Sequence, residues 1–195
     1  AVRLYRADPR RWAMLLERAD ADRDLTGVPD VEACAVIADL HRRLARPGGQ
    51  YTTLSSWVEK WASDLAAFRG DHVPRRYLDQ ATGLARELAV DLRTDGTLID
   101  EDLHYENVLA GDRAPWLAID PKPLSGDPCF EVAPLLWNRF EELAAPGGQG
   151  VRGGVRARFH AAIDAGSLDE DRARDWVGLR MLVLAAERLA DPPGT

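Results

Sequence analysis

The sequence has 195 residues, of which 46% are hydrophobic, and it carries a formal net charge of −7. This length is enough for one sizeable domain or two small ones, and no apolar run approaches the roughly 18 residues of a membrane span. The acidic balance argues against nucleic acid as the main partner, because phosphate backbones select basic surfaces, and it is compatible with a cationic substrate.

The predicted elements begin with two short strands, Val2 to Arg6 and Trp12 to Glu17, joined by a turn at Asp8-Pro9. The polar stretch from Asp20 to Pro29 is expected to be a connector. Asp30 is the expected N-cap of a helix that runs to about Ala45, where Pro47-Gly48-Gly49 ends it.

Two further helices are predicted from apolar residues at helical spacing. One covers Leu54 to Phe68, and the other follows Pro74 with Tyr77 and Leu92 among its expected buried positions. The periodicity then changes between Thr97 and Asp120. Short apolar runs separated by polar loops indicate small strands there, at Leu98-Ile99, Val108-Leu109 and Trp116 to Ile119.

Helical spacing returns after Pro128, from Phe130 to about Leu143. A glycine-rich link at 147–154 leads into a helix from Val155 to Ala165. The last helix is expected to begin with the capping-box pattern Ser167-Leu168-Asp169-Glu170 and to run to about Leu189. The predicted fold class is therefore α+β, a mostly helical domain with a small β element in its middle.

Polar residues crowd into that β element, in the run Asp100-Glu101-Asp102-Leu103-His104-Tyr105-Glu106-Asn107. Asp120 follows at the end of the next predicted strand. Phosphotransfer needs a carboxylate that orients the acceptor hydroxyl and takes its proton, and oxygen ligands that hold Mg²⁺ against the nucleotide phosphates. Asp102, Asn107 and Asp120 supply these groups in the required order.

These segments resemble a known family. Asp102-Leu103-x-x-x-Asn107 matches the catalytic-loop pattern D-L-x-x-x-N of kinases. Together with Trp116 to Pro123, Gly126-Asp127-Pro128 and the Phe130 to Arg139 stretch, it is similar to the aminoglycoside phosphotransferase family, within it to the streptomycin 6-kinase and hydroxyurea phosphotransferase branch.

The resemblance implies a protein-kinase-like fold and ATP- and Mg²⁺-dependent phosphorylation of a polar or cationic antibiotic. It makes Asp102 the catalytic base and Asn107 and Asp120 the Mg²⁺ ligands. The backbone around Glu17 and Arg18 would meet the adenine. Residues 1–18 would then be the last strands of the small lobe and the hinge, and residues 19–195 the helical C-terminal lobe.

The sequence departs from the family pattern in two ways. The broader family often has a His two residues before the catalytic Asp, where this chain has Asp100. No glycine-rich loop or Lys of a small lobe precedes Glu17, so most of the N-terminal lobe is expected to be absent from this chain, and the chain alone to be inactive.

Other functions and roles remain open at this point. The same residues could belong to a non-catalytic binding protein with a kinase fold, or to a metal-dependent hydrolase. His104 is expected to be structural, Lys122 either neutralises the carboxylates or contacts phosphate, and Asp127 and Glu131 either brace the loop or line the cleft. The tryptophans at 57, 61 and 137 are expected to be core residues.

The cysteines and the first residues bear on the compartment. Cys34 and Cys129 are far apart in apolar surroundings and are expected to be reduced thiols. The chain does not open with the apolar block of a secretory signal. We therefore expect a cytoplasmic protein without a membrane or nucleic-acid partner.

Overall fold

The structure is a computed structural model that describes residues 1–70, 72–145 and 150–190. The chain divides into two compact units. The first contains Ala1–Leu44, Asp100–Lys122 and Pro134–Gly166, and the second contains Ala45–Ile99, Pro123–Ala133 and Ser167–Thr195. Among the described residues, none of the helices combines the length and the hydropathy required to cross a bilayer.

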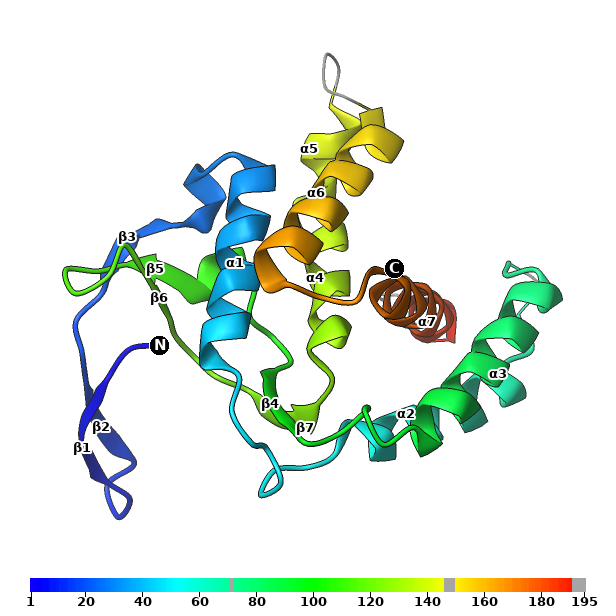
Figure 1. Cartoon of the computed structure of the whole chain (residues 1–195), viewed down its shortest axis with the longest axis horizontal. Coiled ribbons are helices and arrows are strands. Elements are labelled where there is room, and N and C mark those ends of the chain that lie inside the picture. Colours follow the sequence, from blue (N-terminus) through cyan, green and yellow to red (C-terminus); the bar gives the residue numbers. More distant parts are fainter. Residues whose placement is uncertain (71, 146–149, 191–195) are drawn as a thin grey trace. The chain divides into compact units, whose positions relative to one another are not determined.

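The first unit opens with the predicted hairpin. Strands β1 (Leu4–Asp8) and β2 (Ala13–Leu16) pair antiparallel, as Figure 1 shows. Its apolar side chains are largely exposed, with Trp12 at 96% and Met14 at 68% exposure. The hairpin is therefore held by backbone pairing rather than by burial.

A three-stranded antiparallel sheet follows, with the order β3-β5-β6. It is formed by β3 (Asp20–Asp24), β5 (Val108–Ala110) and β6 (Trp116–Ala118). The prediction of a connector over Asp20 to Pro29 was thus wrong in part, since this stretch contains β3 and the short 3₁₀ helix η1 (Leu25–Gly27). The sequence of β3 has no apolar alternation, and the strand forms because β5 pairs with it.

Helices α1 (Asp30–Leu44) and α6 (Gly150–Gly166) pack against each other in this unit (Figure 1). Their contact buries apolar side chains such as Ile37 and Phe159. The fully buried Arg158 donates a 2.8 Å hydrogen bond to the carboxylate of Asp30, and it also donates to the carbonyl oxygens of Asn138 and Arg139. The helix predicted from Asp30 is confirmed, and Asp30 is its first residue.

The predicted helix from Phe130 to Leu143 is broken into three pieces. They are the 3₁₀ helix η3 (Pro128–Glu131), α4 (Val132–Trp137) and α5 (Phe140–Ala144). The break before α5 falls at Arg139, whose φ of 55° lies in the left-handed region. Its guanidinium donates to the carbonyl oxygens of Leu25 and Val28, contacts remote in sequence that apolar spacing cannot reveal.

The second unit is built on helices α2 (Leu54–Ala67), α3 (Arg75–Val90) and α7 (Glu170–Ala190). All three predicted helices are present, and α2 and α3 both contact α7. Tyr77 and Leu92 were wrongly expected to be buried, since they are 42% and 96% exposed. Leu92 lies beyond the end of α3 and therefore leaves its apolar face. Strands β4 (Thr97–Asp100) and β7 (Pro123–Gly126) pair as a small sheet.

The starts of α6 and α7 also differ from expectation. α6 begins at Gly150, so the last glycines of the predicted link are helical, while residues 147–149 lie outside the described part of the chain. At α7 the backbone N–H of Arg172 donates to the carboxylate of Asp169 at 3.0 Å. The cap is thus Asp169 rather than Ser167, whose φ of 54° is not the extended conformation of an N-cap.

Candidate catalytic segment

The polar run from Asp100 to Asn107 forms a loop that buried side chains anchor in the first unit. Leu103 and Tyr105 are 3% and 2% exposed. The Tyr105 hydroxyl donates to the carbonyl oxygen of Leu135 at 3.0 Å and lies 3.1 Å from the Cys34 sulfur, and burial raises the pKa of Tyr105. These buried side chains therefore fix the loop, while the Asp102 side chain remains partly exposed.

Asn107 closes this loop. Its side-chain nitrogen Nδ2 donates a 2.9 Å hydrogen bond to the backbone carbonyl oxygen of Asp102. The short 3₁₀ helix η2 (Tyr105–Asn107) places the side chain where it can reach back over five residues. Because the nitrogen is used within the loop, the amide oxygen is the atom that could ligate a cation.

Asp120 lies at the same end of the β5–β6 pair as Asn107. Val108 pairs with Ala118, and the Ile119 N–H donates to the carbonyl oxygen of Asn107 at 2.9 Å, so Asp120 follows one residue later. Its φ of 47° places it in the left-handed region, which Asp tolerates better than most residues but still at a cost. The structure thus brings the three predicted residues Asp102, Asn107 and Asp120 together in one small region of the first unit.

Lys122 pairs with Asp102 in this structure. Its ammonium donates to Asp102 Oδ2, and that hydrogen bond raises the pKa of Lys122, with the nearby Asp102, Asp120 and Glu101 charges adding to the effect. Of the two roles left open for Lys122, the structure shows the neutralisation of a carboxylate. His104 Nε2 lies 4.0 Å from Asp102 Oδ1, which is too long for a hydrogen bond.

The donor chemistry fits a hard cation. In the described residues, no group of three or more His, Cys, Asp or Glu side chains is placed to hold a metal ion. A Mg²⁺ bound to Asn107 and Asp120 does not need such a group, because Mg²⁺ keeps several waters and takes substrate phosphate oxygens as ligands. Carboxylate and amide oxygens are suitable for it.

The two residues predicted near the adenine have different surroundings. The Glu17 carboxylate accepts from Arg113 at 2.7 and 2.8 Å and from the Arg3 N–H, and the Arg113 hydrogen bond lowers the pKa of Glu17 to about 2. Arg18 instead lines a polar pocket of about 830 Å³ formed by residues 18–23, 110–112, 115 and 116. A nucleotide contact in this region stays a prediction.

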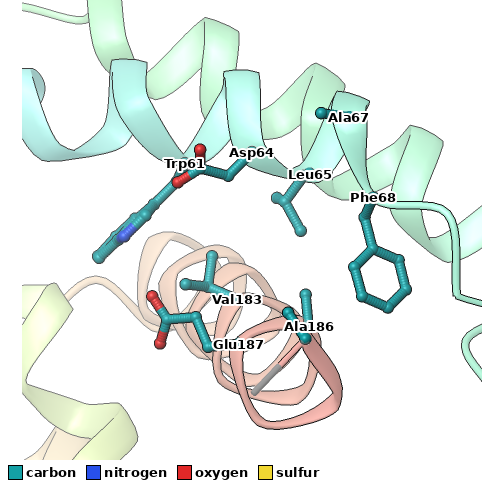
Figure 2. Close-up of a pocket in the computed structure, with 9 residues that line it drawn as sticks. Trp61, Asp64, Leu65, Ala67, Phe68, Val183, Ala186 and Glu187 are labelled. Atoms are coloured by element: carbon teal, nitrogen blue, oxygen red, sulfur yellow. The ribbon is translucent and has the colours of Figure 1, made fainter.

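A second pocket, of about 340 Å³, lies within the second unit between α2 and α7 (Figure 2). Trp61, Leu65, Phe68 and Val183 give it apolar walls, and the Asp64 and Glu187 carboxylates lie at its edge. Trp61 was expected to be a core residue. This prediction is correct in part. The Trp61 ring stacks on the fully buried Phe130 ring, with the two centroids 6.2 Å apart, but the Trp61 side chain is only half-buried.

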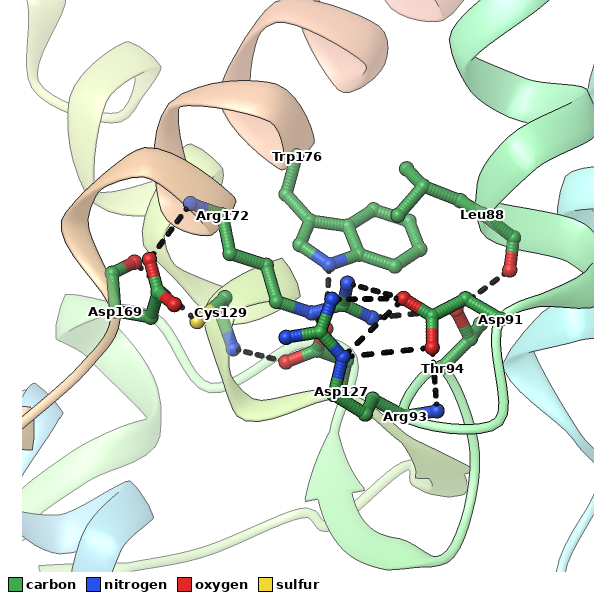
Figure 3. A network of polar contacts seen from close by, with 9 residues as sticks. All are labelled: Leu88, Asp91, Arg93, Thr94, Asp127, Cys129, Asp169, Arg172 and Trp176. Carbon is green, nitrogen blue, oxygen red and sulfur yellow. Dashed lines mark hydrogen bonds and ion pairs between the residues drawn. The ribbon is translucent and has the colours of Figure 1, made fainter.

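Asp127 braces the fold of the second unit, as Figure 3 shows. This carboxylate is 4% exposed and accepts from the Cys129 N–H at 2.9 Å, the Trp176 indole at 2.7 Å and the Arg172 guanidinium. Arg172 also donates to Asp91 at 2.7 Å. The bracing role is the alternative that the structure supports for Asp127. Sequence reasoning missed Arg172 and Asp91, which carry no motif.

Cys129 is a free, buried thiol, as is Cys34.

The sequence model of a family described as aminoglycoside/hydroxyurea antibiotic resistance kinase matches residues 1–191. A streptomycin 6-kinase of Streptomyces glaucescens is 39% identical over 188 residues, 93% of this chain and 60% of that protein. A hydroxyurea phosphotransferase of Kitasatospora aureofaciens is 36% identical over 183 residues, 90% of this chain and 50% of that protein. The chain thus spans 50–60% of the length of these relatives, and no solved structure matches it.

Proposed function

The chain belongs to the aminoglycoside/hydroxyurea antibiotic resistance kinase family, and from this premise we propose that it carries the catalytic segment of a small-molecule kinase. The reaction is transfer of the γ-phosphoryl group of ATP to a hydroxyl of an antibiotic-like acceptor. One observation supports this most: the hydrogen bond from Asn107 to the Asp102 carbonyl and that from Ile119 to the Asn107 carbonyl tie the D-L-x-x-x-N loop to the segment with Asp120.

In this proposal Asp102 orients the acceptor hydroxyl and accepts its proton. Its partly exposed carboxylate stands on a loop fixed by buried side chains, so its position is set before substrate arrives. Such pre-orientation is the main contribution a protein makes to phosphoryl transfer, since the transferring group needs little covalent help. Lys122 holds the Asp102 carboxylate in the free protein and must share or release it when the hydroxyl binds.

Asn107 and Asp120 would hold Mg²⁺, which when bound would neutralise charge on the nucleotide phosphates. The left-handed backbone at Asp120 supports this role, because strained residues persist where surrounding contacts and function maintain them. ATP and Mg²⁺ are thus the cofactors that we propose, with the chain's own contribution limited to these two oxygen-bearing side chains.

We further propose a protein-kinase-like architecture. Residues 1–18 would be the last strands of the small lobe and the hinge, and residues 19–195 the helical C-terminal lobe. The exposed apolar side chains of the β1–β2 hairpin support this, because such a surface suits cover by further strands. The backbone at Glu17 and Arg18 would contact adenine, next to the polar pocket that Arg18 lines.

The acceptor would be a small polar or cationic antibiotic. The relatives are named for streptomycin and hydroxyurea. In this chain Glu101 and Glu106 flank Asp102 along the loop, and the whole chain is acidic, so an acceptor with positive charge is favoured over an anionic one. We place the reaction in the cytoplasm, with no nucleic-acid or membrane partner.

One observation favours a second candidate, a non-catalytic binding protein with the same fold. The Lys122–Asp102 ion pair occupies the carboxylate that a kinase needs as its base. A metal-dependent hydrolase using the same carboxylates is a third candidate and would not need ATP.

A substrate panel decides between these candidates. The complete enzyme is incubated with ATP labelled at the γ-phosphate and with streptomycin, other aminoglycosides or hydroxyurea, and the label is followed into the acceptor. We expect transfer to one of them, and transfer slower by about a hundredfold or more in the matched Asp102→Asn variant. Acceptor binding without transfer would instead support the binding protein, and ATP-independent hydrolysis would support the hydrolase.

A further inference from the structure

We propose that Asp100 is a positioning residue that fastens the loop of Asp102 to the segment of Asp120 and Lys122. Oδ1 of Asp100 accepts hydrogen bonds from two backbone N–H groups, that of Asp102 at 3.3 Å and that of Lys122 at 3.1 Å. A single carboxylate oxygen therefore joins the loop of Asp102, the proposed base, to the segment that follows Asp120, a proposed metal ligand.

The segment just after Asp120 has few main-chain donors of its own. Pro121 and Pro123 carry no backbone N–H, so within 121–123 only Lys122 can donate from the main chain, and it donates to Asp100. The Lys122 carbonyl oxygen accepts from the Glu101 N–H at 3.1 Å. These two bonds, one on each side of Lys122, fix a segment that also contains the strained backbone of Asp120.

A carboxylate suits this position better than the His expected from the broader family. An ionised carboxylate only accepts hydrogen bonds, and those that it accepts are stronger than bonds between neutral groups. A neutral imidazole offers one acceptor nitrogen and a protonated one offers none, so His could not accept from both N–H groups through one atom. In this chain the contact between the Lys122 ammonium and the Asp102 carboxylate follows from the alignment that Asp100 provides.

The test compares Asp100→Ala and Asp100→Asn with a matched control, Asp164→Ala, which changes an exposed carboxylate on α6 in the same unit. The first measurement is amide hydrogen exchange, followed by NMR at the N–H groups of Asp102 and Lys122. We expect exchange at both to be at least about tenfold faster in Asp100→Ala, since a hydrogen bond to a charged acceptor is lost. Asp100→Asn keeps a neutral acceptor and should be intermediate, and the control should match the parent.

The second measurement concerns turnover and depends on the proposed function. In the complete enzyme, Asp100→Ala should lower kcat by about tenfold or more and weaken Mg-nucleotide binding, with a smaller effect on the KM of the acceptor, because a misaligned base and metal ligand affect the reacting groups most. In Asp100→Asn, both the decrease in kcat and the weakening of Mg-nucleotide binding should be smaller than in Asp100→Ala.

The outcomes distinguish the proposed role of Asp100 from the proposed kinase function. If exchange at Asp102 and Lys122 is as slow in Asp100→Ala as in Asp164→Ala, Asp100 does not fasten the loop and the inference is overturned. If Asp100→Ala no longer unfolds cooperatively, the same comparison is made with Asp100→Asn, where exchange equal to the control overturns it. Faster exchange in a protein whose parent transfers no phosphate supports the role of Asp100 and rejects the kinase.

Discussion

Asn107 reaches back across its loop and donates a 2.9 Å hydrogen bond from Nδ2 to the carbonyl oxygen of Asp102. The spacing of the D-L-x-x-x-N pattern thus has a structural meaning, since η2 turns the chain enough for the sixth residue of the pattern to bond to the first. The same Asn107 accepts at its own carbonyl oxygen from the Ile119 N–H. One residue therefore connects the proposed base with the strand that leads to Asp120.

The first prediction concerns the proposed base. Asp102→Asn in the complete enzyme should lower kcat by about a hundredfold or more, because general-base contributions are typically about 10² to 10⁴. Nucleotide binding should survive, since Asp102 is not one of the proposed metal ligands. Steady-state kinetics and calorimetry with Mg-ATP measure the two effects, and near-normal turnover would exclude Asp102 as the base.

The second prediction concerns the proposed metal ligands. Asp120→Ala should weaken Mg-ATP binding by about tenfold or more, and Asn107→Ala should weaken it less, because only Asp120 contributes a full negative charge. The matched control is Asp120→Asn, which tolerates the same left-handed backbone but lacks the charge. Calorimetry with and without Mg²⁺ is the measurement. If both alanine variants bind Mg-ATP as the parent does, these residues are not the ligands.

The third prediction is a pH dependence at the ion pair of Glu17 and Arg113. The pKa of Glu17 is lowered to about 2 by the Arg113 hydrogen bond, against 4.5 for an unperturbed Glu, so the carboxylate stabilises the folded state above about pH 4.5. That stabilisation is lost as the pH falls from 4.5 towards 2. Glu17→Gln should therefore lower Tm at pH 6, and the difference from the parent should shrink on acidification. A Tm difference that does not change with pH would contradict this.

The fourth prediction concerns the buried network at Asp127. Asp127→Ala leaves Arg172 and the Trp176 indole without the carboxylate that they share, and breaking such a buried pair costs about 3–5 kcal/mol. Urea denaturation monitored by tryptophan fluorescence gives the free energy of unfolding. The control is Asp175→Ala on the exposed side of α7, which should change it by about 0.5 kcal/mol at most. Equal losses in the two variants would show that the network contributes little.

Periodicity predicted the elements that local sequence determines. The helices α1, α2, α3 and α7 and the strands β4, β5 and β6 were identified, because their apolar faces or short apolar runs are visible in single segments, whereas β7 was not predicted. Strand β3 was not, since its polar residues become a strand only by pairing with β5, about ninety positions later. The break at Arg139 likewise depends on carbonyl oxygens more than a hundred positions away.

The residues of the candidate site also differ in how far the sequence could predict their contacts. The loop residues Asp102 and Asn107 were identified from one motif, and their hydrogen bond agrees with its spacing. The ion pair of Asp102 with Lys122 was only one of two open alternatives, because its partners come from separate segments. The bonds of Asp100 were not predicted, since an acceptor for backbone N–H groups leaves no pattern in the sequence.

The last prediction concerns residues 1–195 alone. We expect this chain to fold, because both units bury apolar side chains of their own, among them Ile37, Phe159, Leu65 and Trp176. It should nevertheless show little or no phosphotransfer, since a kinase holds the nucleotide phosphates with a glycine-rich loop and a Lys, and residues 1–16 contain neither. The base and metal ligands would remain, but the alignment on which most of the rate depends would be lost.

The experiment expresses residues 1–195, verifies cooperative unfolding, and assays ATP consumption with the same acceptor panel beside the complete enzyme. Calorimetry with each acceptor then asks whether weak binding to the helical part persists, which we expect because the acidic loop residues are all present. The Asp102→Asn variant of the same chain sets the background of the assay. If residues 1–195 turn over as fast as the complete enzyme, they contain everything that catalysis requires, and the proposal of an essential small lobe is wrong.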